Sequence, residues 1–122
     1  MSAALGTGLF VATIVCVLAN AAEVAAKLMR ARFVLQNAAE VGVEPRWIPY
    51  LAVLEGAGVA GLLLGLLGLD AVGLAAAAGL VLFFVGAVTA HIRARVFHNI
   101  AFPAAFLLSA VAAVCYFAWG AG

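Results

Sequence analysis

The sequence predicts an all-α protein: an integral membrane four-helix bundle that forms a single transmembrane domain over residues 1–122. The first observation is composition, because 69% of the residues are hydrophobic and only 9% are charged, whereas a soluble domain carries about a quarter charged residues. The second is that the apolar residues form four runs, at about 5–26, 48–69, 72–90 and 101–119. Each run is long enough, at about 1.5 Å per helical residue, to cross a hydrocarbon core of about 30 Å.

The first run, 5–26, contains no basic residue, and the first one in the chain is Lys27. Secretory signal peptides begin with a basic segment, so we expect this run to be retained as a transmembrane helix. The connection that follows, 27–46, has apolar residues at helical spacing and ends at Gly42 and Pro45. It predicts either a continuation of the first helix or a short interfacial helix.

The remaining spans are joined by short connections. Asp70 alone separates the runs 48–69 and 72–90, which predicts a tight antiparallel hairpin. Residues 93–99 join the third and fourth runs. Trp47 and Tyr50 at the start of the second span, and Trp119 at the end of the fourth, are typical of the membrane interface.

The distribution of basic residues predicts the orientation. All of them lie in the first and third connections: Lys27, Arg30, Arg32, Arg46, Arg93 and Arg95. The positive-inside rule therefore predicts a multi-pass protein of the cell membrane with these connections in the cytoplasm and both termini outside. The net charge of +1 predicts no nucleic-acid partner.

Glu55 is the most informative residue for function, because it is the only charged residue in the run 48–69. A carboxylate inside the bilayer costs about 2.5–3.5 kcal/mol on insertion scales, so it is expected to face protein or water and to have a partner. The predicted topology puts most other polar side chains on the same, cytoplasmic side of the midplane: Asn20, Glu23, Thr89, His91, His98 and Asn99. This sorting predicts a cytoplasm-facing polar pocket within the membrane.

Helical spacing indicates which residues share a face with the candidates. One face of the first span holds Cys16, Asn20, Glu23 and Lys27. One face of the second span holds Glu55, Gly58, Leu62 and Gly65. One face of the third span holds Gly79, Gly86, Thr89 and Arg93, while His91 points elsewhere. We therefore expect a ligand site formed by Asn20, Glu23, Glu55, Thr89 and Arg93.

Each candidate also has a purely structural interpretation. Glu55 would then be a buried acid, hydrogen-bonded to Asn20, Thr89 or Arg93, that holds the helices in register. Glu23 would pair with Lys27 at i+4, and His91 would be an interfacial histidine among arginines. No metal site is expected, since Cys16 and Cys115 form no ligand spacing and a turn separates His91 from His98.

Two segments form recognisable motifs: Leu54-Glu55-Gly56-Ala57-Gly58, with the following Gly61 to Leu66, and Ala90-His91-Ile92-Arg93. They resemble the DoxX-like family of small membrane proteins. Weaker similarity lies in three further stretches: Ala26-Lys27-Leu28, Gly42-Val43-Glu44-Pro45 and the small-residue run from Gly73 to Val88. Asn20 and Glu23 depart from the pattern, which often has a Ser-Gly stretch there. The resemblance implies a four-helix membrane bundle, and some relatives are named as subunits of quinone-linked oxidoreductases. More distantly, the layout is similar to the emopamil-binding-protein and sigma-2 receptor group, although fold alone does not fix function.

The residues leave open whether the protein is an enzyme. In the first hypothesis the bundle binds a lipophilic ligand such as a quinone or an isoprenoid, with Glu55 and Asn20 at its polar end, or is an accessory subunit of a membrane oxidoreductase. No cofactor other than such a quinone is expected.

In the alternative, an isomerase or epoxide-opening enzyme uses Glu55 as acid and Glu23 as base, with His91 as a relay. This needs both carboxyls in one cavity, within about one bridging water. A transporter is least favoured, and it would be helped by a homodimer through Gly61 and Gly65.

Overall fold

Long apolar helices make up most of the computed structural model, which describes residues 2–121. They are α1 (Ala3–Leu28), α3 (Ile48–Leu66), α4 (Asp70–Arg93) and α5 (Ala101–Ala121). Within the described residues these are the helices long and apolar enough to cross a membrane, and no strand is present. The prediction of an all-α bundle with four membrane-spanning helices is confirmed, with helix bounds a few residues from the expected spans.

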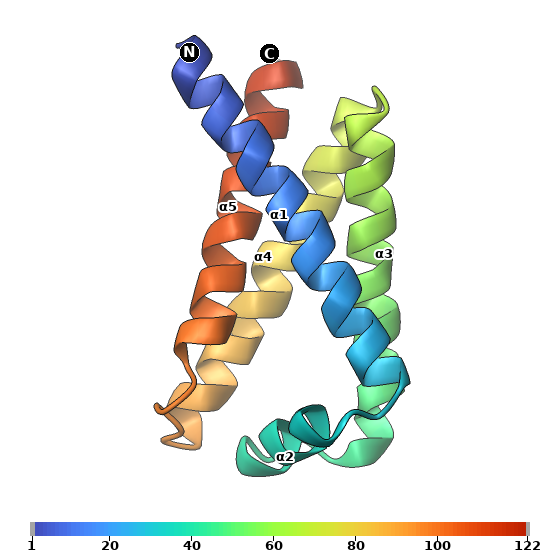
Figure 1. The fold of residues 1–122 in the computed structure, drawn as a ribbon, viewed down its shortest axis with the longest axis vertical. Coiled ribbons are helices and arrows are strands. Elements are labelled where there is room, and N and C mark those ends of the chain that lie inside the picture. Colours follow the sequence, from blue (N-terminus) through green and yellow to red (C-terminus); the bar gives the residue numbers. More distant parts are fainter. Residues whose placement is uncertain (1, 122) are drawn as a thin grey trace.

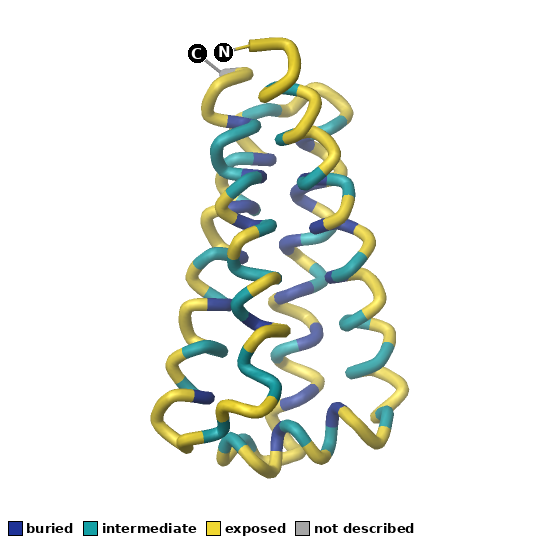
Figure 2. Tube along the Cα trace, turned by 60° about the vertical axis from the view of Figure 1, so that its left-hand side comes forward, coloured by how far each residue is buried: buried dark blue, intermediate teal, exposed yellow. Residues whose placement is uncertain are grey.

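The long helices form a ring in which α1 contacts α3, α3 contacts α4, α4 contacts α5, and α5 closes onto α1. Both termini lie at one end of the bundle, which we call the terminal half, and α2 lies at the other, which we call the α2 half (Figure 1). Buried residues line the inner faces of the helices, while exposed residues cover the outside (Figure 2). Apolar exposed side chains are what a bilayer-facing surface requires.

Glycines let α3 and α4 pack closely in the terminal half. A Cβ atom on Gly61 would collide with Ala76 of α4, and one on Gly65 or Gly73 would lie 2.6–2.8 Å from ring atoms of Phe117. Phe117 of α5 is fully buried in the notch that these glycines leave. The expectation that Gly61 and Gly65 supply a homodimer interface is therefore wrong, because the same chain already covers both positions.

The helix ends share one backbone arrangement. α1, α3 and α4 each end in a Schellman motif, in which the N–H of the second residue past the cap reaches back five residues: Ala31 to Ala26, Leu69 to Leu64, and Val96 to His91. The motif needs one residue at positive φ, and this residue is Gly68 after α3 but Arg30 and Arg95 after α1 and α4. The turn before α4 is thus Leu67–Leu69. The sequence predicts that Asp70 alone forms this turn, but in the structure Asp70 is the first residue of α4.

α2 (Arg32–Glu40) is a separate short helix that crosses the end of the bundle, with the 3-10 turn η1 (Pro45–Trp47) leading from it into α3 (Figure 1). Its buried Val34 and Ala38 pack against Ile48 at the start of α3. Two polar contacts join α2 to the α4–α5 connection. Asn99 Nδ2 donates to Asn37 Oδ1 at 3.0 Å, and His98 Nε2 lies 3.0 Å from Glu40 Oε2. α2 therefore closes this end of the bundle from both sides.

Candidate functional site

A buried charge cluster joins α1 to α3 in the α2 half. Lys27 Nζ donates to Glu55 Oε1 at 2.7 Å and lies 3.4 Å from Glu23 Oε2, one turn earlier on α1. The Glu55 side chain is 0% exposed, that of Lys27 14% and that of Glu23 33%, so the charges run from the interior of the bundle outward. The cluster holds two carboxylates and one ammonium group.

The partner of Glu55 is Lys27, and it is not one of the three residues expected from the sequence. Asn20 Nδ2 instead donates to the Cys16 carbonyl at 2.8 Å, and the Thr89 hydroxyl donates to the Val85 carbonyl at 2.7 Å. The reason is reach: α1 and α3 are antiparallel neighbours, and a four-carbon lysine side chain extends from the last turn of α1 to the second turn of α3. The predicted i, i+4 pairing of Glu23 with Lys27 is confirmed.

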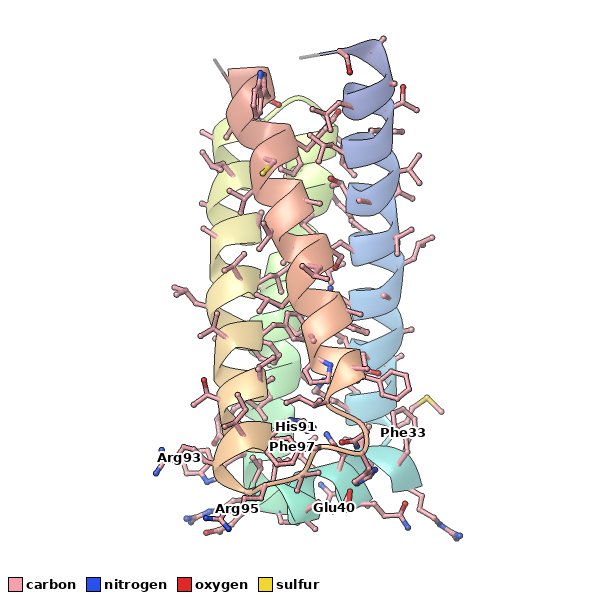
Figure 3. All side chains as sticks on the ribbon, turned by 90° about the vertical axis from the view of Figure 1, so that its left-hand side faces the viewer. Phe33, Glu40, His91, Arg93, Arg95 and Phe97 are labelled. Atoms are coloured by element: carbon pink, nitrogen blue, oxygen red, sulfur yellow. The ribbon has the colours of Figure 1, made fainter. Side chains whose placement is uncertain are left out.

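α4 turns a different face inward from the one that its glycines suggested. Its buried residues are Gly73, Ala77, Leu80, Phe84 and His91, which recur at helical spacing. Thr89 and Arg93 are exposed, and Figure 3 shows Arg93 pointing away from the bundle while His91 lies between the helices. Gly79 and Gly86 have nothing within 4 Å of where a Cβ would stand, so the later glycines of α4 do not mark close helix contacts.

A cavity of about 660 Å³ occupies the α2 half. Residues from α1, α2, α3, α4 and α5 line it, and its apolar wall includes Phe33, Val34, Leu51, Phe83, Phe84 and Phe106. The polar residues on its lining include Glu23, Lys27, His91, His98 and Asn99. Of the residues predicted from the sequence, the lining thus contains Glu23 and His91, whereas Asn20, Glu55, Thr89 and Arg93 lie elsewhere.

The buried polar atoms near this end of the bundle are incompletely paired. His91 is 3% exposed, and its Nδ1 lies 2.8 Å from the Ala87 carbonyl oxygen, but its Nε2 has no partner. Glu55 Oε2, Asn20 Oδ1 and Asn99 Oδ1 are also buried without a hydrogen-bond partner among the described residues. Such atoms are uncommon in folded proteins, and each calls for an explanation in terms of a bound water, a ligand or a function.

Lys27 is the site residue whose role is not evident from the sequence, which indicates only its contribution to orientation and its pairing with Glu23. The information was present, because Lys27 shares a helix face with Asn20 and Glu23, and that face turns inward. In general, a lysine in the last turn of a transmembrane helix is a candidate partner for an intramembrane acid when it lies on the same inward face as other polar residues of that helix.

The described residues contain no group of three or more His, Cys, Asp or Glu side chains arranged to hold a metal ion. The cluster at Lys27 brings two acids together around an ammonium group, which lies where a metal cation between the two acids would otherwise lie. The chemistry that this arrangement offers is therefore ion pairing and hydrogen bonding at the edge of an apolar cavity.

The profile of the DoxX-like family matches residues 11–113, a region that extends from α1 into α5 and includes the charge cluster and His91. No significant match was found among curated proteins or among solved structures. Because the match covers most of the chain and the long helices can span a bilayer, the chain belongs to the DoxX-like family and is a multi-pass membrane protein.

Proposed function

We propose that this DoxX-like protein binds a lipophilic small molecule, of the quinone or isoprenoid kind, in the cavity of its α2 half. The observation that carries the proposal is a cavity of about 660 Å³ with an aromatic wall and with polar groups contributed by α1, α2, α4 and the α4–α5 connection. Ligand sites in proteins have volumes of about 300–1,000 Å³ and are mostly apolar, with a small number of polar groups that fix orientation. The cavity matches that description in size and in lining.

The charge cluster supports binding by fixing the wall of the cavity. A charge buried alone is costly, but the 2.7 Å contact between Lys27 and Glu55 compensates both groups and ties α1 to α3. Glu23, one-third exposed, is the acid of the charge cluster that lines the cavity. We therefore assign Glu55 a positioning role behind the wall, and Glu23 a place among the groups that meet the polar end of the ligand.

Two alternatives have less support. An acid–base enzyme that uses Glu55 needs substrate to reach that carboxyl, yet the Glu55 side chain is fully buried and paired with Lys27. An accessory subunit would dock through the glycine-rich faces of the second and third spans, and Gly79 and Gly86 are uncovered, but α4 and Phe117 cover Gly61 and Gly65. Binding in the cavity requires neither access to Glu55 nor exposure of Gly61 and Gly65.

The proposal is tested by native mass spectrometry and lipid extraction on the purified protein. The informative pair is Gly86→Trp and Gly79→Trp, because both glycines lie on α4 with open space at Cβ, but only Gly86 lines the cavity. We expect a lipophilic compound to co-purify with the wild type and with Gly79→Trp, and to be lost from Gly86→Trp. A compound retained equally by both variants would place binding elsewhere, and a wild type without any compound would contradict the proposal.

A further inference from the structure

The buried, unpaired Nε2 of His91 gives the proposed cavity a chemical preference. We infer that the polar end of the ligand is a hydrogen-bond donor, a hydroxyl group, which donates to His91 Nε2. The inference rests on the proposed function, because it describes how the same cavity selects its ligand. It is carried by a side chain that lines the cavity, is 3% exposed and has no partner for one ring nitrogen.

The hydrogen bond on the other side of the ring fixes what Nε2 can do. Nδ1 lies 2.8 Å from the carbonyl oxygen of Ala87, and a carbonyl oxygen only accepts, so Nδ1 carries the hydrogen. In the neutral ring Nε2 then presents a lone pair and acts as an acceptor. Because the Ala87 carbonyl lies one turn earlier on α4, the helix itself fixes both the tautomer and the orientation of the ring.

The other unpaired buried atoms have the same character. Asn20 Oδ1, Glu55 Oε2 and Asn99 Oδ1 are all acceptors, and Asn99, like His91, belongs to the lining. The ammonium group of Lys27, by contrast, is already engaged by Glu23 and Glu55. The buried atoms of the lining that lack a partner, His91 Nε2 and Asn99 Oδ1, therefore need donors, and an anionic or purely carbonyl-bearing head would leave them unsatisfied.

This identifies the class of ligand more closely. An isoprenoid alcohol or a hydroquinone offers an O–H group on an apolar body that fits against Phe83, Phe84 and Phe106, whereas an oxidised quinone offers only acceptors. An unsatisfied buried acceptor loses the full value of its hydrogen bond, so binding should discriminate between a compound with the hydroxyl and the same compound without it. The expected preference is about five- to tenfold.

The experiment compares farnesol with farnesyl methyl ether, which has the same chain but no O–H. Binding of each is measured calorimetrically to the full-length protein in phosphatidylcholine nanodiscs, for the wild type, His91→Phe and Thr89→Val. Thr89 lies two residues before His91 on α4 but is exposed and is not part of the cavity lining, which makes it the control. We expect the wild type and Thr89→Val to prefer farnesol about five- to tenfold, and His91→Phe to show no preference.

A second readout needs no variant. In the ¹⁵N NMR spectrum of the wild-type protein, farnesol should shift the Nε2 resonance of His91, and the ether should leave it in place. If both probes bind the wild type equally and the resonance does not move, the inference is overturned while lipophile binding stands. If neither probe binds, the proposed function fails for isoprenoid ligands, and the inference fails with it.

Discussion

The two halves of this bundle are built from the same helices but packed in opposite ways. In the terminal half, glycines bring α3 and α4 into contact and Phe117 fills the remaining notch. The rings of Phe10 and Tyr116 also meet there, with centroids 5.8 Å apart, so α1 and α5 are held together. In the α2 half, α1 and α5 diverge (Figure 1), and the space within that half holds a cavity and paired charges.

The difference shows how a small membrane protein can be both stable and hollow. Lipid tails are as apolar as leucine, so helices associate through close packing and polar contacts, and burial of apolar area contributes little. The terminal half uses close packing, which excludes voids. The α2 half uses an ion pair and the α2 closure, which hold helices at a distance. A cavity is therefore compatible with only one of the two modes of association.

The largest effect should come from removing the charge that holds the α2 half together. Lys27→Met leaves Glu55 as an uncompensated buried carboxylate and should destabilise the protein by about 3–5 kcal/mol. Adding Glu55→Leu to the same chain removes the orphaned charge and should restore much of this loss. Unfolding by SDS in mixed micelles measures both variants.

The control for this prediction is Glu23→Gln, which disturbs only the partly exposed end of the cluster and should cost about 0.5 kcal/mol or less. If the double variant is as unstable as Lys27→Met alone, the stability of the α2 half does not rest on the balance of these two charges.

The next largest effect tests the terminal half. Gly73→Leu introduces a side chain where ring atoms of Phe117 already lie 2.6 Å from the Cβ position, and overpacking of this kind costs about 1–3 kcal/mol. Gly79→Leu on the same helix meets open space and should be neutral or slightly stabilising, because leucine favours helix more than glycine does. The same SDS titration separates the two. Equal losses would mean that glycine is needed on α4 for a reason other than close packing.

A smaller and local effect is expected where α2 closes the cavity. Glu40→Gln weakens the contact with His98, and exposed pairs of this type contribute about 0.2–1 kcal/mol. Amide hydrogen exchange should become faster in α2 and remain unchanged in the buried turns of α3 and α4. Glu44→Gln is a suitable control, since Glu44 pairs only with the exposed Arg46. Faster exchange throughout the bundle would show that α2 does not open independently.

The membrane-spanning helices and the inward direction of Glu55 were predictable from the sequence, because apolar length and a lone acid are local properties of the chain. The partner of Glu55 was not predictable from local properties, since it depends on how far Lys27 reaches across to a neighbouring antiparallel helix. The cavity was also hidden, because it results from the divergence of α1 and α5, which no helix specifies alone.

α4 shows where a sequence rule gave the wrong face. Small residues often permit close helix contacts, and this holds for Gly61, Gly65 and Gly73 but fails for Gly79 and Gly86. The positions differ in depth along the bundle. Gly61, Gly65 and Gly73 lie in the closely packed terminal half, whereas Gly86 lies in the α2 half, where the cavity separates the helices. Glycine alone therefore did not indicate which way His91 points.

The smallest expected effect concerns the helix ends in the two halves. α3 ends in the terminal half with Gly68 at positive φ, whereas α4 ends in the α2 half with Arg95 at φ 57°. A residue with a side chain is disfavoured there, so Arg95→Gly should stabilise the protein by about 0.5 kcal/mol once the greater freedom of glycine in the unfolded chain is counted. Arg93→Gly removes a similar charge from the last helical residue of α4 and should destabilise by about 0.5–1 kcal/mol. Opposite signs in the SDS titration would assign the effect to backbone conformation. If both variants change stability in the same direction, the charge at this end of the bundle matters more than the strain at Arg95.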